Sequence, residues 1–188
     1  MQTAKGRPKL ERAKIVENAI TLMDELGYEA LTLRKLAARL GVQAPALYWH
    51  FADRAALLEA MVAELQDRVP VTPVPMTRGE TGDWILARGI AFRQMLHAIR
   101  DSVRLFAEAT INPTMDAQFA EMLNRIEGLD RRQVTYLAAV LNSYVLGWVH
   151  YEQQPEMARF MGQNLDVEAD FESGLRAIAI GMTAQLGL

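Results

Sequence analysis

The sequence lacks cysteine altogether, which excludes disulfide bonds, thiolate metal sites and a cysteine nucleophile. It also lacks an apolar run of the roughly 18 to 20 residues that a membrane span requires. The longest such run, residues 136–149, is interrupted by Asn142 and Ser143. The N-terminus is polar and basic, without the apolar segment of a secretory signal. We therefore expect a cytoplasmic protein with no membrane partner.

Sequence signatures of enzymes are missing too. The chain has no P-loop, no G-x-S-x-G and no dinucleotide-binding fingerprint. Its 3 histidines, His50, His97 and His150, do not have the spacing of metal ligands. We expect a protein that is not an enzyme and that uses neither a cofactor nor a metal.

The net charge of -3 conceals an uneven distribution. Residues 1–54 contain nine Lys and Arg against six Asp and Glu, whereas residues 55–188 contain 11 against 17. A basic N-terminal part on an acidic remainder indicates an anionic partner for the first part.

Apolar residues recur at helical spacing along most of the chain, and no segment shows the alternation of a strand, so the pattern predicts an all-α protein. Thr32, Asp53 and Asp130 have the chemistry of helix N-caps. Proline-rich residues 70–83 read as a loop, and residues 162–166 as a polar break. The expected helical segments are residues 10–26, 33–40, a short one from Pro45, one from residue 54, 84–110, 115–128, 130–153 and 167–187.

Two short helices joined by a Gly-containing turn, held by a longer first helix, are the pattern of a helix-turn-helix. We predict an N-terminal three-helix helix-turn-helix DNA-binding domain at residues 1–54. A long helix joins it to a C-terminal helical ligand-binding and dimerisation domain at residues 55–188.

The stretch "LYWHF", residues 47–51, lies in the third helix of this pattern. At about 100° per residue, Leu47 and Phe51 share the inner side of the helix with Ala44. The outward side, with His50 at its margin, then holds Pro45, Ala46, Tyr48 and Trp49. Burial of this helix on all sides is the alternative, but Leu47 and Phe51 already anchor it, and we favour contact of the aromatic side with DNA.

Basic residues near these helices are candidates for DNA contacts. Arg34, in the first turn of the second helix, has the position for a bidentate contact to guanine. Thr32 and Lys35 are candidates for phosphate contacts. Lys5 and Arg7 belong to a basic arm that reaches the DNA backbone or the minor groove, or else only increases solubility.

The C-terminal part is rich in methionine and aromatic residues, which line adaptable apolar pockets but are also ordinary core residues. His97, Arg104, Asn142 and Tyr144 are candidates for polar contacts to a ligand there. The predicted pocket residues are Phe92, Met95, Phe106, Met115, Phe119, Met122, Tyr144 and Trp148.

The segments 130–153 and 167–187 are apolar around much of their circumference. They belong either to a thick single-chain bundle or to an interface with a second copy. Helix-turn-helix proteins usually need two reading heads, which favours a homodimer. The predicted interface residues are Val134, Leu137, Leu141, Leu175, Ile178 and Met182.

Residues 31–61, "LTLRKLAARLGVQAPALYWHFADRAALLEAM", resemble the DNA-binding region of the TetR family of transcriptional regulators, and their "LYWH" form resembles the tetracycline-repressor branch. The resemblance implies a homodimeric repressor that binds a palindromic double-stranded DNA operator and is released by a small-molecule effector. It assigns base reading to Arg34 and phosphate binding to Arg54. The implied recognition-helix contacts are Pro45, Tyr48, Trp49 and His50.

The sequence departs from that branch in two places. Ala44 and Ala46 stand where the tetracycline repressor has polar residues, so we expect a different operator. The positions that hold the tetracycline–magnesium complex are here Pro70, Arg88 and Phe106, so we expect a largely apolar effector and no metal. The alternative is a helical small-molecule-binding protein or enzyme with a vestigial helix-turn-helix.

Overall fold

The computed structural model describes residues 10–70, 77–109 and 129–187. The predicted contacts of Lys5 and Arg7 lie outside these residues, as does the expected helix 115–128 with its pocket candidates Met115, Phe119 and Met122. Throughout the described ranges the elements are α-helices and short 3-10 turns, with no strand. None of the described helices is long and apolar enough to cross a bilayer.

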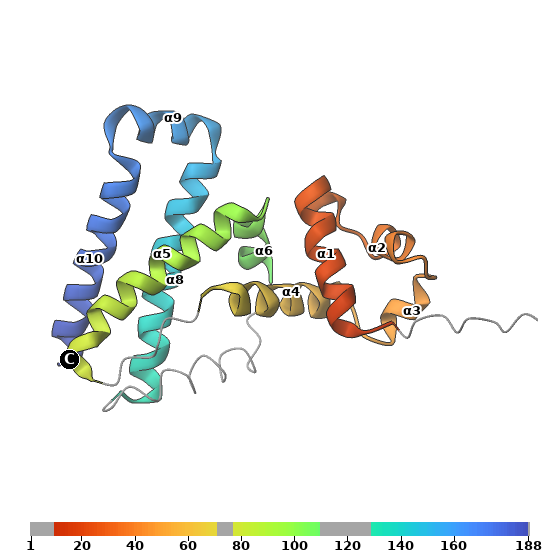
Figure 1. Cartoon of the computed structure of the whole chain (residues 1–188), viewed down its shortest axis with the longest axis horizontal. Coiled ribbons are helices and arrows are strands. Elements are labelled where there is room, and N and C mark those ends of the chain that lie inside the picture. The colour runs from red at the N-terminus through yellow and green to blue at the C-terminus, as the bar shows by residue number, and fades with distance from the viewer. Residues whose placement is uncertain (1–9, 71–76, 110–128, 188) are drawn as a thin grey trace, which may run out of the picture.

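The first three helices form a small head, which is followed by a connecting helix, α4 (Figure 1). Thr32 and Asp53 are confirmed as N-caps, because their side chains accept hydrogen bonds from the backbone N–H groups of Lys35 and Ala56. The elements are α1 (Arg12–Leu26), η1 (Tyr28–Ala30), α2 (Leu33–Leu40), α3 (Pro45–Tyr48) and α4 (Arg54–Arg68).

The remaining elements form a body in which α5, α8 and α10 pack together and α9 lies across the end of α8 and α10 (Figure 1). Asp130 caps α8 through a reciprocal capping box with Gln133. The elements are η2 (Arg78–Glu80), α5 (Thr81–Ala98), α6 (Ser102–Glu108), α8 (Arg131–Gln153), α9 (Pro155–Asn164) and α10 (Val167–Leu186). This arrangement of head, connecting helix and helical body confirms the predicted fold class.

The predicted segments differ from the structure in several places. α5 begins at Thr81, inside the expected loop 70–83, and α9 has no counterpart among the expected helices. The helical segment 84–110 is broken at Asp101, whose φ of 56° is left-handed, so α5 and α6 are separate helices. The buried Ser102 hydroxyl donates a hydrogen bond to the Leu96 carbonyl across this break, at 2.6 Å. The expected polar break at 162–166 is shorter than predicted, because Gly162 lies inside α9 and only Leu165 and Asp166 separate α9 from α10.

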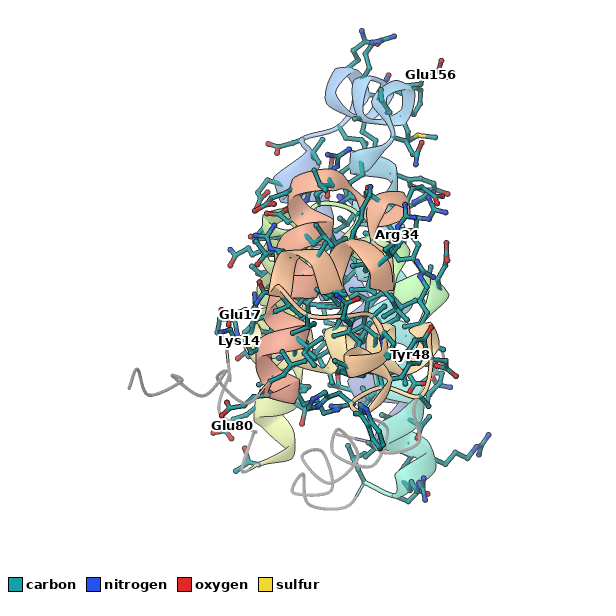
Figure 2. All side chains as sticks on the ribbon, turned by 90° about the vertical axis from the view of Figure 1, so that its right-hand side faces the viewer. Lys14, Glu17, Arg34, Tyr48, Glu80 and Glu156 are labelled. Carbon is teal, nitrogen blue, oxygen red and sulfur yellow. The ribbon has the colours of Figure 1, made fainter. Side chains whose placement is uncertain are left out.

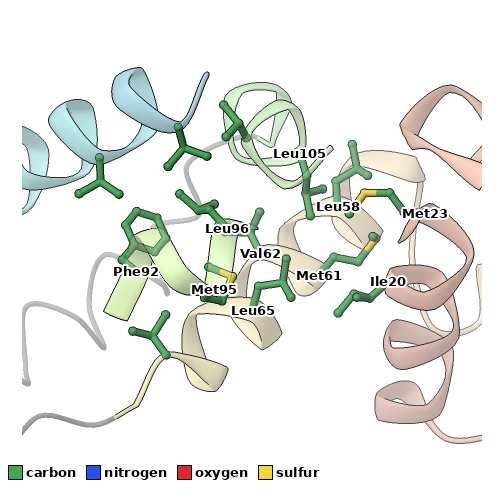
Figure 3. Packing of buried hydrophobic residues seen from close by; sticks show 14 of the residues in the cluster. Ile20, Met23, Leu58, Met61, Val62, Leu65, Phe92, Met95, Leu96 and Leu105 are labelled. Carbon is green, nitrogen blue, oxygen red and sulfur yellow. The ribbon is translucent and has the colours of Figure 1, made fainter. Parts of the chain in front are cut away.

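One apolar core runs from the head through α4 into the body (Figure 3). Met23 on α1 faces Leu58 and Met61 on α4, while the next turn of α4 turns Leu65 toward Met95 on α5. α4 thus packs against both the head and the body.

An ion cluster holds α5, α8 and α10 together. Arg93 Nη2 lies 2.6 Å from Glu152 Oε1, and Arg93 Nη1 lies 2.6 Å from Glu168 Oε2. His97 Nε2 is 2.7 Å from Glu152 Oε2, and the Trp148 indole N–H also donates to Glu152. Burial opposes ionisation of Glu152, but hydrogen bonds from Arg93 and His97 outweigh it and hold the pKa of this carboxyl below its usual value.

Leu47→Ala tests how α3 is held, because the Leu47 side chain is fully buried. We expect the free energy of unfolding to fall by about 2–5 kcal/mol, measured by urea denaturation. Trp49→Ala is the control, with an expected change within about 0.5 kcal/mol, because Trp49 is 90% exposed. Equal losses in the two variants would contradict the assigned orientation of α3.

Glu152→Gln removes the charge that Arg93 and His97 share. We expect the free energy of unfolding at pH 7 to fall by about 3 kcal/mol, measured by urea denaturation. The pKa of Glu152 is lower in the folded state than in the unfolded state. The carboxylate therefore contributes fully to the free energy of unfolding above the unfolded-state pKa of about 4.3, and this contribution is lost as the pH falls through the folded-state pKa. The difference between wild type and variant should therefore shrink below about pH 4, and a constant difference down to pH 3 would rule out ionisation as its cause.

Candidate functional site

The structure separates the "LYWHF" stretch into two sets, as its spacing predicts. Leu47 is 0% exposed and Phe51 is 2% exposed, with the Arg12 guanidinium over the Phe51 ring. Tyr48 is 55% exposed and Trp49 is 90% exposed, the largest exposed fraction among the large apolar side chains of the described residues. The burial of α3 on all sides, which the sequence left open, is therefore excluded.

The other candidates on the head lie close to this aromatic surface in sequence and are accessible. Figure 2 views the head end of the molecule and shows Arg34 and Tyr48 on one side of it, with Lys14 and Glu17 on the opposite side. Ala44, Ala46 and His50 are half-buried, and the exposed candidates are Thr32, Arg34, Lys35, Pro45, Tyr48, Trp49 and Arg54.

The positive charge on this face is only partly neutralised by the protein. Arg39 pairs in two hydrogen bonds with Glu25, which lowers the pKa of that carboxyl. Arg34 and Lys35 form no ion pair within the part of the chain that the structure describes, and both are exposed. Two unpaired cations beside exposed aromatic rings with polar tips suit an anionic, groove-bearing partner better than an apolar one.

The pocket candidates that the structure describes fall into two aromatic clusters in the body. Phe92 and Met95 are buried, and the Phe92 ring meets the half-buried Phe106 edge-on at 5.4 Å. Tyr144 and Trp148 pack on Phe171 instead, with ring centroids 5.5 and 5.7 Å apart. The Tyr144 hydroxyl donates to the Phe171 carbonyl, so it is already engaged within the protein.

The polar pocket candidates are also engaged in part. His97 contacts Glu152. Arg104 pairs with Glu29, at 2.6 Å, and with Glu108, at 2.9 Å. Among the described residues, no group of three or more His, Asp or Glu side chains is arranged to hold a metal ion.

Most of the predicted interface residues point into their own chain. Val134, Leu137, Leu141, Leu175 and Met182 are buried in the core, and Ile178 is half-buried. The exposed small and apolar residues of α8 and α10 are others, and they include Tyr136, Ala139, Ser143, Gly147, Ala177, Ile180, Gly181 and Ala184. Small residues among them recur at intervals of three to four along one side of each helix.

Tyr28 lies at the junction of head and body, and sequence reasoning missed it. Its backbone N–H donates to Asp101 Oδ2 at 2.8 Å, and its hydroxyl donates to Glu108 Oε2 at 2.8 Å. Burial, and then the hydrogen bond to Glu108, raises the pKa of the Tyr28 phenol, so it remains a donor at neutral pH.

Further contacts reinforce this junction. The Arg100 backbone N–H donates to Asp24 Oδ1 at 2.8 Å. The guanidinium groups of Arg54 and Arg104 both lie 4.8 Å from the centroid of the Tyr28 ring. We call the contacts of Tyr28, Asp24 and Glu29 with residues 100–108 the head–body clasp.

Comparison with known proteins identifies the family. The family model described as "Bacterial regulatory proteins, tetR family" matches residues 15–61, which include α2, α3 and the first half of α4. The class C tetracycline repressor protein of Escherichia coli is 32% identical over 183 residues, covering 95% of this chain and 78% of that protein. The chain belongs to the TetR family. TetR-family proteins are regulators of transcription rather than enzymes.

Solved TetR-family structures match this chain over most of its length. A TetR variant from Acinetobacter baumannii AYE, in complex with minocycline, has a TM-score of 0.76 at 28% identity, covering 95% of this chain and 99% of that one. BioQ with its double-stranded DNA operator has a TM-score of 0.69 at 26% identity, covering 94% and 99%. The described head and body therefore have the relative arrangement of complete family members.

Tyr48→Ala tests the exposed face of the head. Affinity for duplex DNA from the region upstream of the chain's own gene should fall about tenfold, or ~1.4 kcal/mol, measured by fluorescence anisotropy. Folding should be unchanged, because the ring is largely exposed. Tyr151→Ala, at a 50% exposed tyrosine near the end of α8, is the matched control and should bind DNA like wild type. Equal DNA affinity in the two variants would remove the case for this face.

Proposed function

We propose that this TetR-family protein is a cytoplasmic, ligand-responsive repressor that binds a palindromic operator as a homodimer and is released by a small-molecule effector. The observation that carries the proposal is the exposure of Tyr48 and Trp49 beside the unpaired Arg34 and Lys35. A short helix that is held by two buried anchors and presents its other side to solvent is suited to the major groove.

Within this proposal the head residues divide into two roles. Arg34 reads a base, because its guanidinium is exposed and free of carboxylates. Thr32, Lys35 and Arg54 position the head on phosphates, together with the arm residues Lys5 and Arg7. Ala44, Pro45, Ala46, Tyr48, Trp49 and His50 face the groove, and the two alanines offer methyl groups that suit thymine rather than polar base edges.

The homodimer would form through the exposed sides of α8 and α10. Ile180 is 64% exposed and Tyr136 is 41% exposed. Small residues lie next to each of them on its helix, so a helix of a second copy can approach closely. A two-fold pairing of these sides gives two heads that read the two halves of a palindrome. We place the boundary between the DNA-binding part and the ligand-binding and dimerisation part at residues 54 and 55, where α4 begins.

The effector would act through the head–body clasp and α4. A ligand that binds near Phe92, Met95 and Phe106 contacts α5 and α6. Glu108 at the end of α6 and the left-handed Asp101 just before it accept the hydrogen bonds that hold Tyr28. A change in α6 therefore alters the position of the head. Coupling of about 1–3 kcal/mol between effector and operator is sufficient for regulation.

Arg34→Ala tests base reading. The binding free energy is measured for operators with single base-pair changes. The variant should lose about 1–3 kcal/mol of base preference at one position in each half-site and keep its preference at the other positions. Arg39→Ala is the control, because Arg39 is exposed but bound to Glu25. A uniform loss over all operator sequences would make Arg34 a phosphate contact instead.

The salt dependence of binding tests the function itself. A DNA-binding repressor should show a log–log slope of about −0.9 for each phosphate contact. DNA binding too weak to give such a slope would favour the alternative, a helical small-molecule-binding protein with a vestigial helix-turn-helix.

A further inference from the structure

Arg88 in the middle of α5 differs from the other arginines of the described chain. It is half-buried, and it forms no ion pair or hydrogen bond with any residue that the structure describes. Burial alone lowers the pKa of its guanidinium, with no compensating partner. The positive charge of Arg88 is thus held partly out of water, and no carboxylate among the described residues neutralises it.

The contrast with Arg93, five residues along the same helix, shows that this is not a general feature of the body. Arg93 is the other half-buried arginine among the described residues, and it has two carboxylates at 2.6 Å. Arg104 is exposed and also has two carboxylate partners. Within the described residues, both of these arginines thus have acidic partners, and Arg88 has none.

The position of Arg88 on α5 places it among apolar residues. At about 100° per residue, it shares one side of the helix with Trp84, Phe92 and Met95, all of which are buried. Figure 3 shows Met95 next to Leu65 of α4, and the Phe92 ring contacts Phe106 of α6. Arg88 is thus the one charged residue on the side of α5 where we place the effector.

An unpaired guanidinium in such a place is costly unless a ligand supplies the missing anion. A planar guanidinium binds a carboxylate through two parallel hydrogen bonds, and the apolar surroundings strengthen that pairing. The described residues on this side of α5 supply one positive charge, which a monoanion balances and a phosphate dianion would exceed.

We propose that Arg88 binds the carboxylate of the effector, which is therefore an amphipathic organic acid with an apolar body. The apolar part lies against Phe92, Met95 and Phe106, and the acid group pairs with Arg88. This assignment rests on the proposed function, because it names the ligand class of the same effector site. It adds an acid group to the largely apolar effector that the sequence predicts.

The test compares acids with their uncharged amides on the full-length protein. The probes are 2-naphthoic acid with 2-naphthamide, and octanoic acid with octanamide, titrated at pH 7 and followed by thermal shift and by isothermal calorimetry. We expect each acid to raise the melting temperature more than its amide does, since a ligand that binds the folded state stabilises it by mass action. Equal responses to acid and amide, or no response to either acid, would overturn the proposal.

Three variants locate the acid group. Arg88→Gln should weaken acid binding by at least about tenfold and leave amide binding unchanged, whereas Arg88→Lys should retain part of the preference because it keeps the charge without the planar fork. Arg176→Gln, at an exposed arginine of α10, is the matched control and should bind like wild type. An acid preference that survives in Arg88→Gln would place the carboxylate elsewhere.

The ligand-free variant gives an independent readout. Because Arg88→Gln removes an unneutralised charge, its melting temperature without ligand should rise by about 2 °C or stay equal to wild type. A fall of several degrees would mean that Arg88 holds the fold together and would count against a ligand-binding role.

A DNA assay separates this assignment from the proposed function. If the acids bind through Arg88 but the protein never binds operator DNA, the repressor proposal fails and the ligand assignment stands. If the protein binds DNA but neither acid dissociates it from the DNA or shows dependence on Arg88, the ligand assignment fails and the repressor proposal stands.

Discussion

The apolar side of α4 is the constraint on which the rest of the structure depends. Leu58 and Met61 pack against α1, while Val62 and Leu65 pack against the helices of the body (Figure 3). A single 15-residue helix thus contributes to both the head end and the body end of the one apolar core. Because close-packed side chains do not deform continuously, a shift of α4 against the body carries the head with it. The clasp at Tyr28 adds a second, polar attachment between the same two parts.

The head shows how a very short helix acquires a defined orientation. α3 spans only Pro45–Tyr48, too short to be stable alone, so tertiary contacts must hold it. Leu47 and Phe51 provide them, one turn apart, and the same register necessarily turns Tyr48 and Trp49 outward. The spacing that buries Leu47 and Phe51 therefore also exposes Tyr48 and Trp49. An exposed tryptophan, which would be a liability on an ordinary surface, here belongs to the face that we assign to DNA.

Much of the fold was predictable from local chemistry, because capping residues and apolar stripes act within one or two turns. Thr32, Asp53 and Asp130 each mark a helix start correctly for this reason. The break at Asp101 was not predictable, since a non-glycine residue in the left-handed region depends on contacts with distant Tyr28. Leu141 and Leu175 were assigned to an interface because periodicity identifies an apolar side but does not say which molecule covers it.

The effector site shows the same limit. The sequence singles out Arg88 only as a departure from the tetracycline-repressor pattern. Only the folded chain determines which acidic residues reach which arginines. Arg93 finds Glu152, 59 residues away, while Arg88 finds no partner among the described residues.

The head–body clasp has a consequence for building hybrid regulators. Asp24, Tyr28 and Glu29 lie before the helix-turn-helix proper, yet they make the specific polar contacts with residues 100–108. A chimera that takes α2 and α3 from another family member and keeps residues 10–30 of this chain would preserve the joint. A chimera that also replaces residues 24–29 would lose these contacts. Its head and body would then be uncoupled, even if each folded correctly. The transplantable unit is thus smaller than the DNA-binding domain.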